Sequence, residues 1–98
     1  MLIRIVKMHF RAEEKDNFLL LFNSIKEKII NFEGCTYLEL MEDYNDPNSF
    51  STYSKWQDAS ALDAYRNSAL FDKVWIQTKA MFSEKPIAIS LKSHTKVN

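Results

Sequence analysis

Few side chains in this sequence can do acid–base or nucleophilic chemistry. The chain has two histidines, His9 and His94, and one cysteine, Cys35. His9 falls near the end of a strand-like segment and is a candidate general base, although a histidine in such a place is more often a surface or interface residue. His94 lies in a polar C-terminal tail, where we expect it to be solvated. The sequence therefore offers one candidate imidazole base.

The same side chains bear on metal and cofactor binding. The two histidines and Cys35 do not have the spacing of a metal site. Cys35 follows the only glycine, Gly34, at a strand start, where a buried and unreactive thiol is expected. A chain with one glycine cannot build a Gly-rich phosphate loop. The sequence therefore predicts no metal and no cofactor.

Aromatic residues are the more informative feature, with seven Phe, four Tyr and two Trp. Between helices and a sheet such rings can line a pocket for a flat apolar ligand, and core packing is the alternative for each of them. Tyr65 and Trp75 also carry a polar group that needs a partner if it is buried. The rings that fall on or beside the expected core are Phe22, Phe50, Trp56, Tyr65, Phe71, Trp75 and Phe82.

Charge and hydropathy limit the class of protein. Thirteen Lys and Arg balance thirteen Asp and Glu, so the basic face of a nucleic-acid or acidic-membrane binder is not expected. The longest apolar run, Phe18 to Phe22, is far shorter than the ~20 residues of a membrane span. Arg4 and Lys7 interrupt the N-terminal segment where a signal peptide would be apolar. We expect one cytoplasmic domain over 1–98, with a polar tail at about 93–98.

Periodicity predicts the elements that would position these residues. Apolar positions spaced by three and four predict a helix from Glu13 to Phe32, with Gly34 as its C-terminal cap. Asp58 and Ser68 are expected N-caps of two further helices, the second running through Phe82. Alternating patterns predict strands at 2–10, 35–42, 50–56 and 87–91.

This order of elements is the split βαβ pattern of a ferredoxin-like α+β fold with a four-stranded antiparallel sheet. Helices would cover one face of the sheet, yet both faces carry apolar residues. The first strand has Val6 and Met8 on one face and Ile3 and Ile5 on the other. Because exposed apolar area costs about 25 cal/mol per Å², we expect a homodimer through the sheet faces. Scattered exposed apolar residues without a partner are the alternative.

The segment Trp56–Phe71, WQDASALDAYRNSALF, carries a family resemblance. Together with the Gly34–Cys35 step after a long amphipathic helix, it resembles the antibiotic biosynthesis monooxygenase (ABM) domain family over about residues 2–92. The resemblance implies a dimeric α+β barrel with substrates between sheet and helices. It also implies cofactor-independent monooxygenases of quinols and polycyclic aromatics, haem-degrading enzymes, or a signal-processing branch.

Only some residues of this chain match those typical of the family. Trp56 matches the family's tryptophan, whereas Tyr65 and Leu70 stand where family members often have histidines. The haem-degrading branch has an asparagine in its first strand and a histidine early in its last helix. Here no asparagine precedes Asn17 and Trp75 stands near that histidine position, so haem degradation is not expected.

The leading hypothesis is a monooxygenase of a quinol, phenolic or polycyclic aromatic molecule. Its catalytic candidates are Tyr65, as hydrogen-bond partner of a substrate oxygen, and His9, as base. Arg66 follows Tyr65 by about 100 degrees around a helix, so it is not assigned a role. The alternatives are a non-catalytic ligand-binding or regulatory dimer and a purely structural dimer. The residues expected to line the substrate pocket are Phe22, Phe50, Trp56, Phe71 and Trp75.

Overall fold

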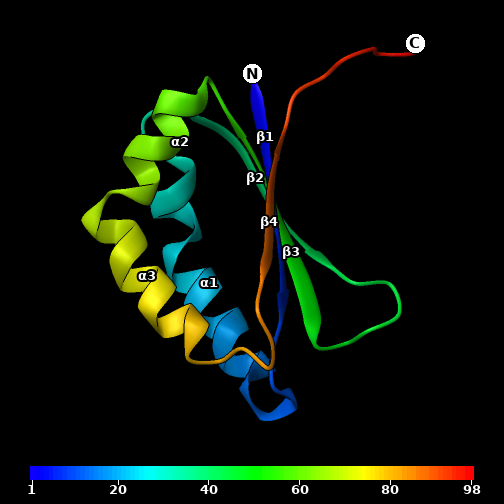
Figure 1. Cartoon of the computed structure of the whole chain (residues 1–98). Coiled ribbons are helices and arrows are strands. Elements are labelled where there is room, and N and C mark those ends of the chain that lie inside the picture. The colour runs from blue at the N-terminus through cyan, green and yellow to red at the C-terminus, as the bar shows by residue number, and fades with distance from the viewer.

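The computed structural model describes all residues 1–98 and has two layers, a sheet and a set of helices that covers one of its faces (Figure 1). The strands are β1 (Leu2–His9), β2 (Cys35–Glu42), β3 (Ser49–Trp56) and β4 (Ile87–Leu91). The helices are the short 3-10 helix η1 (Ala12–Glu14), α1 (Lys15–Ile30), α2 (Ala59–Arg66) and α3 (Ala69–Lys79).

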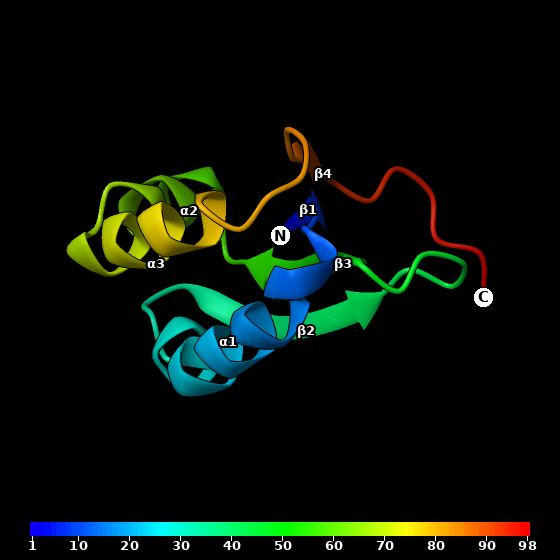
Figure 2. The same ribbon diagram turned by 90° about the horizontal axis from the view of Figure 1, so that it is seen from below.

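The sheet runs in the order β2-β3-β1-β4, and each neighbouring pair is antiparallel. The predicted ferredoxin-like α+β fold is thereby confirmed. Seen from below, α1 lies toward the β2 edge of the sheet, and α2 and α3 lie toward the β4 edge (Figure 2). A space lined by side chains of both layers lies between these helices and the sheet.

Strand register decides which side chains face that space. Side chains alternate along a strand, so Arg4, Val6 and Met8 of β1 share the face that the helices cover. Arg4 pairs with Ser54 of β3 and with Ser90 of β4, which places three polar side chains in one row across the sheet. An arginine therefore lies on the apolar side of the central strand.

The main core cluster lies where β1 leads into α1. It consists of Met8, Phe10, Phe18 and Phe50, all of them buried. The rings of Phe10 and Phe18 stack with centroids 4.1 Å apart. Burying a phenylalanine side chain contributes about 1.5–3 kcal/mol to folding. This cluster closes the layers at one end of β1 and keeps Phe50 out of the space between them.

Asp58 and Ser68 are the N-caps of α2 and α3, as predicted, whereas α1 ends at Ile30 with Asn31, and not Gly34, as its C-cap. Asp58 accepts a hydrogen bond from the backbone of Ala61 at 2.9 Å, and Ser68 accepts one from Phe71 at 3.1 Å. The third helix ends earlier than predicted, at Lys79. The chain turns there because Phe82 forms a bridge with Phe10 in place of another helical turn.

Gly34 joins α1 to β2 in a conformation that other residues avoid. Its φ is +89°, in the left-handed region that favours glycine. A Cβ added there would lie 2.4 Å from the Cβ of Ala61. The glycine thus allows both the turn and the close approach of α2.

The opposite face of the sheet has no covering element (Figure 1). Large apolar side chains are exposed on it, including Tyr37 and Met41 of β2. On β4, Ile87, Ile89 and Leu91 are 58%, 43% and 46% exposed. An apolar sheet face of this kind is typical of a surface that another protein surface covers.

Candidate functional site

A cavity of about 230 Å³ lies between the covered face of the sheet and the helices. Val6, Thr52 and Ala88 of the sheet form one wall, and Phe22 of α1 faces them from the helical side. Fifteen of its 21 lining residues are hydrophobic. The cavity is therefore suited to a small apolar molecule, with few polar groups to orient it.

Four of the five predicted pocket aromatics line this cavity: Phe22, Trp56, Phe71 and Trp75. The fifth, Phe50, does not line it. Phe50 points into the core cluster, where its ring lies 5.9 Å from that of Phe18, centroid to centroid. The strand pattern placed Phe50 on the correct face, but the register puts it opposite Met8, at the closed end of the layers.

The aromatic side chains form a continuous wall along α2 and α3. Trp56 stacks on Tyr65 with centroids 5.1 Å apart, and Tyr65 meets Phe71 edge to face at 5.2 Å. Phe71 then stacks on Trp75 at 5.7 Å. Each contact restrains the next ring, so the wall is fixed before any ligand binds.

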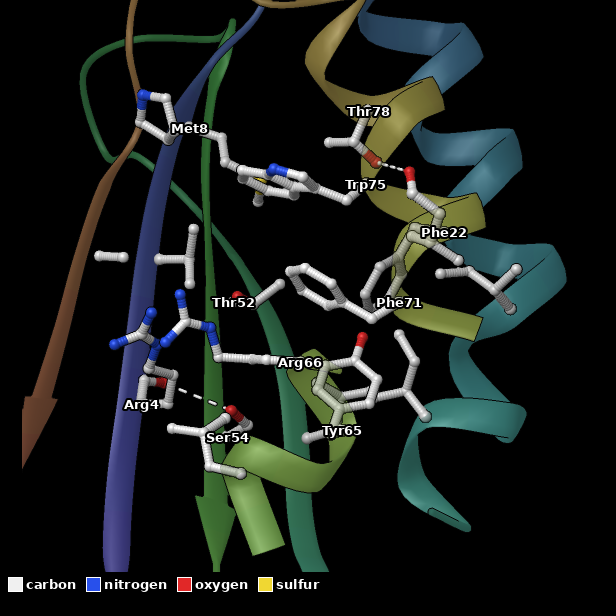
Figure 3. Close-up of a pocket in the computed structure, with 18 of the residues that line it drawn as sticks. Arg4, Met8, Phe22, Thr52, Ser54, Tyr65, Arg66, Phe71, Trp75 and Thr78 are labelled. Atoms are coloured by element: carbon white, nitrogen blue, oxygen red, sulfur yellow. Dashed lines mark hydrogen bonds between the residues drawn. The ribbon is translucent and has the colours of Figure 1, made fainter. Parts of the chain in front are cut away.

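Tyr65 occupies the last turn of α2, and its backbone is held by the next helix cap. The Ser68 hydroxyl donates to the Tyr65 carbonyl at 2.6 Å. The Tyr65 hydroxyl itself has no partner within the chain and points into the cavity (Figure 3). Burial raises the pKa of Tyr65 to about 12. At neutral pH this phenol is therefore protonated and available to donate a hydrogen bond to a ligand.

Trp56 is fixed in a different way. Its indole Nε1 donates to the Ser54 hydroxyl at 3.0 Å, and the side chain is only 1% exposed. Ser54 also faces the cavity and lies 3.5 Å from the carbonyl oxygen of Arg4. A buried, hydrogen-bonded indole is a rigid part of the cavity lining.

His9 lies away from the cavity. It is on the opposite face of β1 from Met8, because neighbouring side chains of a strand alternate. Its Nδ1 contacts the Ser49 hydroxyl, and its Nε2 lies 3.2 Å from a Glu84 carboxylate oxygen. Asp46 is also nearby, with its Oδ2 3.9 Å from Nδ1. The structure therefore does not bring the two predicted catalytic side chains, His9 and Tyr65, together.

Two charged residues that the sequence analysis did not assign to the site line the cavity: Arg4 of β1 and Arg66 at the end of α2. Arg66 was not assigned a role, because it follows Tyr65 by about 100 degrees around the helix. From the end of this short helix, its long side chain reaches across toward Arg4 on β1 (Figure 3). Arg4 had a signal in the sequence, because it shares the alternating face of Val6 and Met8.

No Asp, Glu, His, Lys or Cys side chain lines the cavity. Elsewhere in the chain, no group of three or more His, Cys, Asp and Glu side chains is arranged to hold a metal ion. No helix has the length and apolar character needed to cross a membrane. The chemistry of the cavity therefore comes from aromatic rings, hydroxyls and two guanidinium groups.

A family model described as antibiotic biosynthesis monooxygenase matches residues 1–74, the part that contains β1 to most of α3. The chain belongs to this family. The match includes Trp56, Tyr65 and Phe71 of the aromatic wall and ends just before Trp75.

Solved structures agree with this ABM fold. One described as an antibiotic biosynthesis monooxygenase has a TM-score of 0.90 at 23% identity and covers 97% of this chain and 100% of its own. A conserved protein from Methanosarcina mazei has a TM-score of 0.89 at 20% identity, and the match covers 96% of this chain and 94% of that protein. A protein from Mycobacterium tuberculosis has a TM-score of 0.88 at 15% sequence identity, and the match covers 99% of this chain and 98% of that protein. At these identities the likeness concerns the fold. No curated protein sequence matches the chain.

Proposed function

We propose that this ABM protein is a cofactor-independent monooxygenase acting on a quinol, a phenol or a polycyclic aromatic molecule. The observation that carries the proposal is the aromatic cavity between sheet and helices, with the unpartnered Tyr65 hydroxyl inside it. Membership of the ABM family supports the reaction type. The flat rings of Trp56, Phe71 and Trp75 favour a planar ligand.

The reaction needs only the substrate and dioxygen. An electron-rich ring that has lost a proton can pass an electron to O₂ and then combine with the reduced oxygen. For an anthrone, the methylene group and one O₂ give a carbonyl group and one water molecule. The carbon is oxidised, one oxygen atom enters the product and the other leaves as water. No metal or organic cofactor enters this balance.

The residues of the cavity support this chemistry by binding and electrostatics. The Tyr65 hydroxyl donates a hydrogen bond to a substrate oxygen, which holds the ring in one orientation. The positive charges of Arg4 and Arg66 favour the ionised substrate and lower its pKa. Because no imidazole or carboxylate lines the cavity, the proton passes to solvent at the opening. His9 is not retained as the base, since it does not reach the cavity.

The functional unit is a homodimer formed through the uncovered sheet face. The exposed side chains of β4 and β2 supply an apolar surface on that face. A two-fold dimer covers it in both copies at once. We place the protein in the cytoplasm, where the single thiol of Cys35 stays reduced.

The second candidate is a non-catalytic small-molecule-binding or regulatory dimer. The specific observation in its favour is the lack of any cavity group that titrates near neutral pH, because Tyr65 stays protonated. A binder needs volume and aromatic walls, and no proton acceptor.

Oxygen uptake separates the two candidates. The protein is mixed with a panel of quinols and anthrones, and the rate is compared with the spontaneous rate in the same buffer. The monooxygenase predicts a rate above the spontaneous one for at least one planar substrate. Binding of the same compounds, seen by quenching of Trp56 and Trp75 fluorescence, with no added oxygen uptake, supports the binder.

A further inference from the structure

Arg4 and Arg66 are the only charged residues among those lining the cavity. The cavity therefore carries two positive charges and no negative one. Arg66 at the end of α2 is exposed, whereas Arg4 on the central strand is half-buried. The two guanidinium groups lie near each other on one side of the cavity (Figure 3).

Neither guanidinium has an acidic partner. The ion pairs of the chain involve Lys7, His9 and Arg11 as cations, and none of them includes Arg4 or Arg66. Arg4 donates one hydrogen bond, from Nη1 to the Ser90 hydroxyl at 3.0 Å. The remaining guanidinium N–H groups of the pair are free to bind an acceptor.

Two positive guanidinium groups close together repel each other when no ligand is bound. Burial, and then the nearby Arg66 charge, lower the pKa of Arg4. An arginine stays charged in proteins, so the repulsion is not relieved by loss of a proton. An oxyanion placed between the two groups would turn this repulsion into two charge-assisted, bidentate contacts.

We propose that Arg4 and Arg66 form an oxyanion site for an aromatic acid, whose rings fill the apolar interior and whose carboxylate or phosphate lies at the opening. The inference rests on the proposed function only in taking the cavity as the ligand site. It goes further because a neutral phenol or quinol offers no permanent charge to the pair.

The positions of the polar groups fit a ligand with two different ends. The Tyr65 hydroxyl points into the aromatic interior, whereas the guanidinium groups lie at the opposite side of the cavity (Figure 3). An acid group on the arginines would fix one end of the ring system, and Tyr65 would receive an oxygen at the other. Together they would set which ring carbon is presented for oxidation.

The test uses probes that cannot be oxidised under these conditions. Naphthalene-2-carboxylate, naphthalen-2-yl phosphate and the neutral naphthalene-2-carboxamide are titrated into the full-length protein by calorimetry at low salt. The site predicts that at least one anion binds about tenfold or more tightly than the amide. Its affinity should fall as salt is raised. The comparison of carboxylate with phosphate shows which oxyanion fits better.

Variants assign the preference to the two arginines. Arg66→Gln and Arg4→Gln should each weaken binding of the preferred anion about tenfold and leave the amide within about twofold. Arg4→Lys should restore part of the loss, because the charge returns without the fork of donors. Lys73→Gln, which removes an exposed charge of α3 outside the cavity lining, should change neither ligand.

The outcomes also separate this inference from the proposed function. Equal affinity for anion and amide, or an unchanged anion affinity in Arg66→Gln, overturns the oxyanion site. Oxygen uptake with neutral quinols is measured separately, and a rate above the spontaneous one would support the proposed function even where the naphthalene probes overturn the oxyanion site. Selective anion binding that depends on both arginines supports the site even if no quinol is oxidised. Failure of every naphthalene probe to bind contradicts the site as well.

Discussion

At the scale of single residues, Tyr65 combines two roles that the fold makes compatible. Its ring is part of the wall between Trp56 and Phe71, and its hydroxyl is the polar group that faces the interior. Burial raises its pKa to about 12, so the hydroxyl donates a hydrogen bond at neutral pH and does not take a proton. In the proposed reaction, Tyr65 therefore orients the substrate and is not the base.

Tyr65→Phe tests this role in catalysis. The variant keeps the ring and removes the donor, so one hydrogen bond to the substrate is lost. That loss corresponds to about a tenfold lower kcat/KM in the oxygen-uptake assay. Because Tyr65 is not the base, the pH profile between pH 6 and 9 should keep its shape. A change in the profile, or full activity, would contradict the assignment.

The same substitution has a separate effect on stability at alkaline pH. In the unfolded chain Tyr65 ionises around its ordinary pKa of 10.0, while in the folded chain it holds its proton to about 12. Ionisation of Tyr65 therefore lowers the free energy of the unfolded state first, and folding stability falls as pH rises from 10 to 12. Between pH 9 and 11, the free energy of unfolding measured with urea should fall by about 1 kcal/mol more for the wild type than for Tyr65→Phe. Equal losses would show that burial does not raise this pKa.

The aromatic part of the site could be predicted from sequence, and the strand pattern also carried a signal for Arg4, but Arg66 could not be predicted. Helical and strand periodicity place Trp56, Phe71 and Trp75 on inward faces, and all three line the cavity. Strand register decides whether an inward-facing ring lines the cavity or packs in the core. The sequence pattern does not give this register, so Phe50 was wrongly predicted to line the cavity. Arg66 was missed because backbone direction around a helix does not fix where a long, flexible side chain ends.

At the scale of elements, the site depends on how α2 and α3 are joined. The Ser68 hydroxyl bonds both the Tyr65 carbonyl and the Phe71 amide, so one side chain links two members of the aromatic wall. Gly34 fixes the other end of α2, through its contact with Ala61. Strand and helix periods predicted these elements to within a few residues. The end of α3 was predicted too late, because the Phe10–Phe82 bridge is a long-range contact.

Gly34→Ala should destabilise the fold by about 1–3 kcal/mol or more, since a Cβ adds both left-handed strain and overlap with Ala61. Chemical denaturation measures the loss. In the double variant Gly34→Ala with Ala61→Gly, only the overlap is removed. The double-mutant cycle should therefore show a favourable coupling between the two positions. Additive effects would mean that α2 does not press on this turn.

At the scale of the whole molecule, the two faces of the sheet have different roles. The covered face holds the cavity, while the uncovered face presents the exposed apolar side chains of β4 and β2. A dimer through the uncovered face would leave the cavity openings free and would stiffen the strand that carries Arg4.

Sedimentation measures the oligomeric state directly. The wild type should have a mass near two chains at micromolar concentration. Ile89→Arg places a charge in the proposed interface and should give a single chain. Ile76→Arg is the matched control, because Ile76 is 68% exposed on α3 and away from the sheet. A monomeric wild type, or equal behaviour of the two variants, contradicts the dimer.

The central claim is that the cavity between sheet and helices is where an aromatic substrate is oxidised. Its most direct test is oxygen uptake with an anthrone by Thr52→Phe, in which a phenyl ring grows from the strand wall into the cavity. Thr52→Val keeps the volume and serves as the control. We predict that Thr52→Phe falls to the spontaneous rate while remaining folded by circular dichroism, and that Thr52→Val stays close to the wild type. Undiminished oxygen uptake by folded Thr52→Phe would contradict the claim.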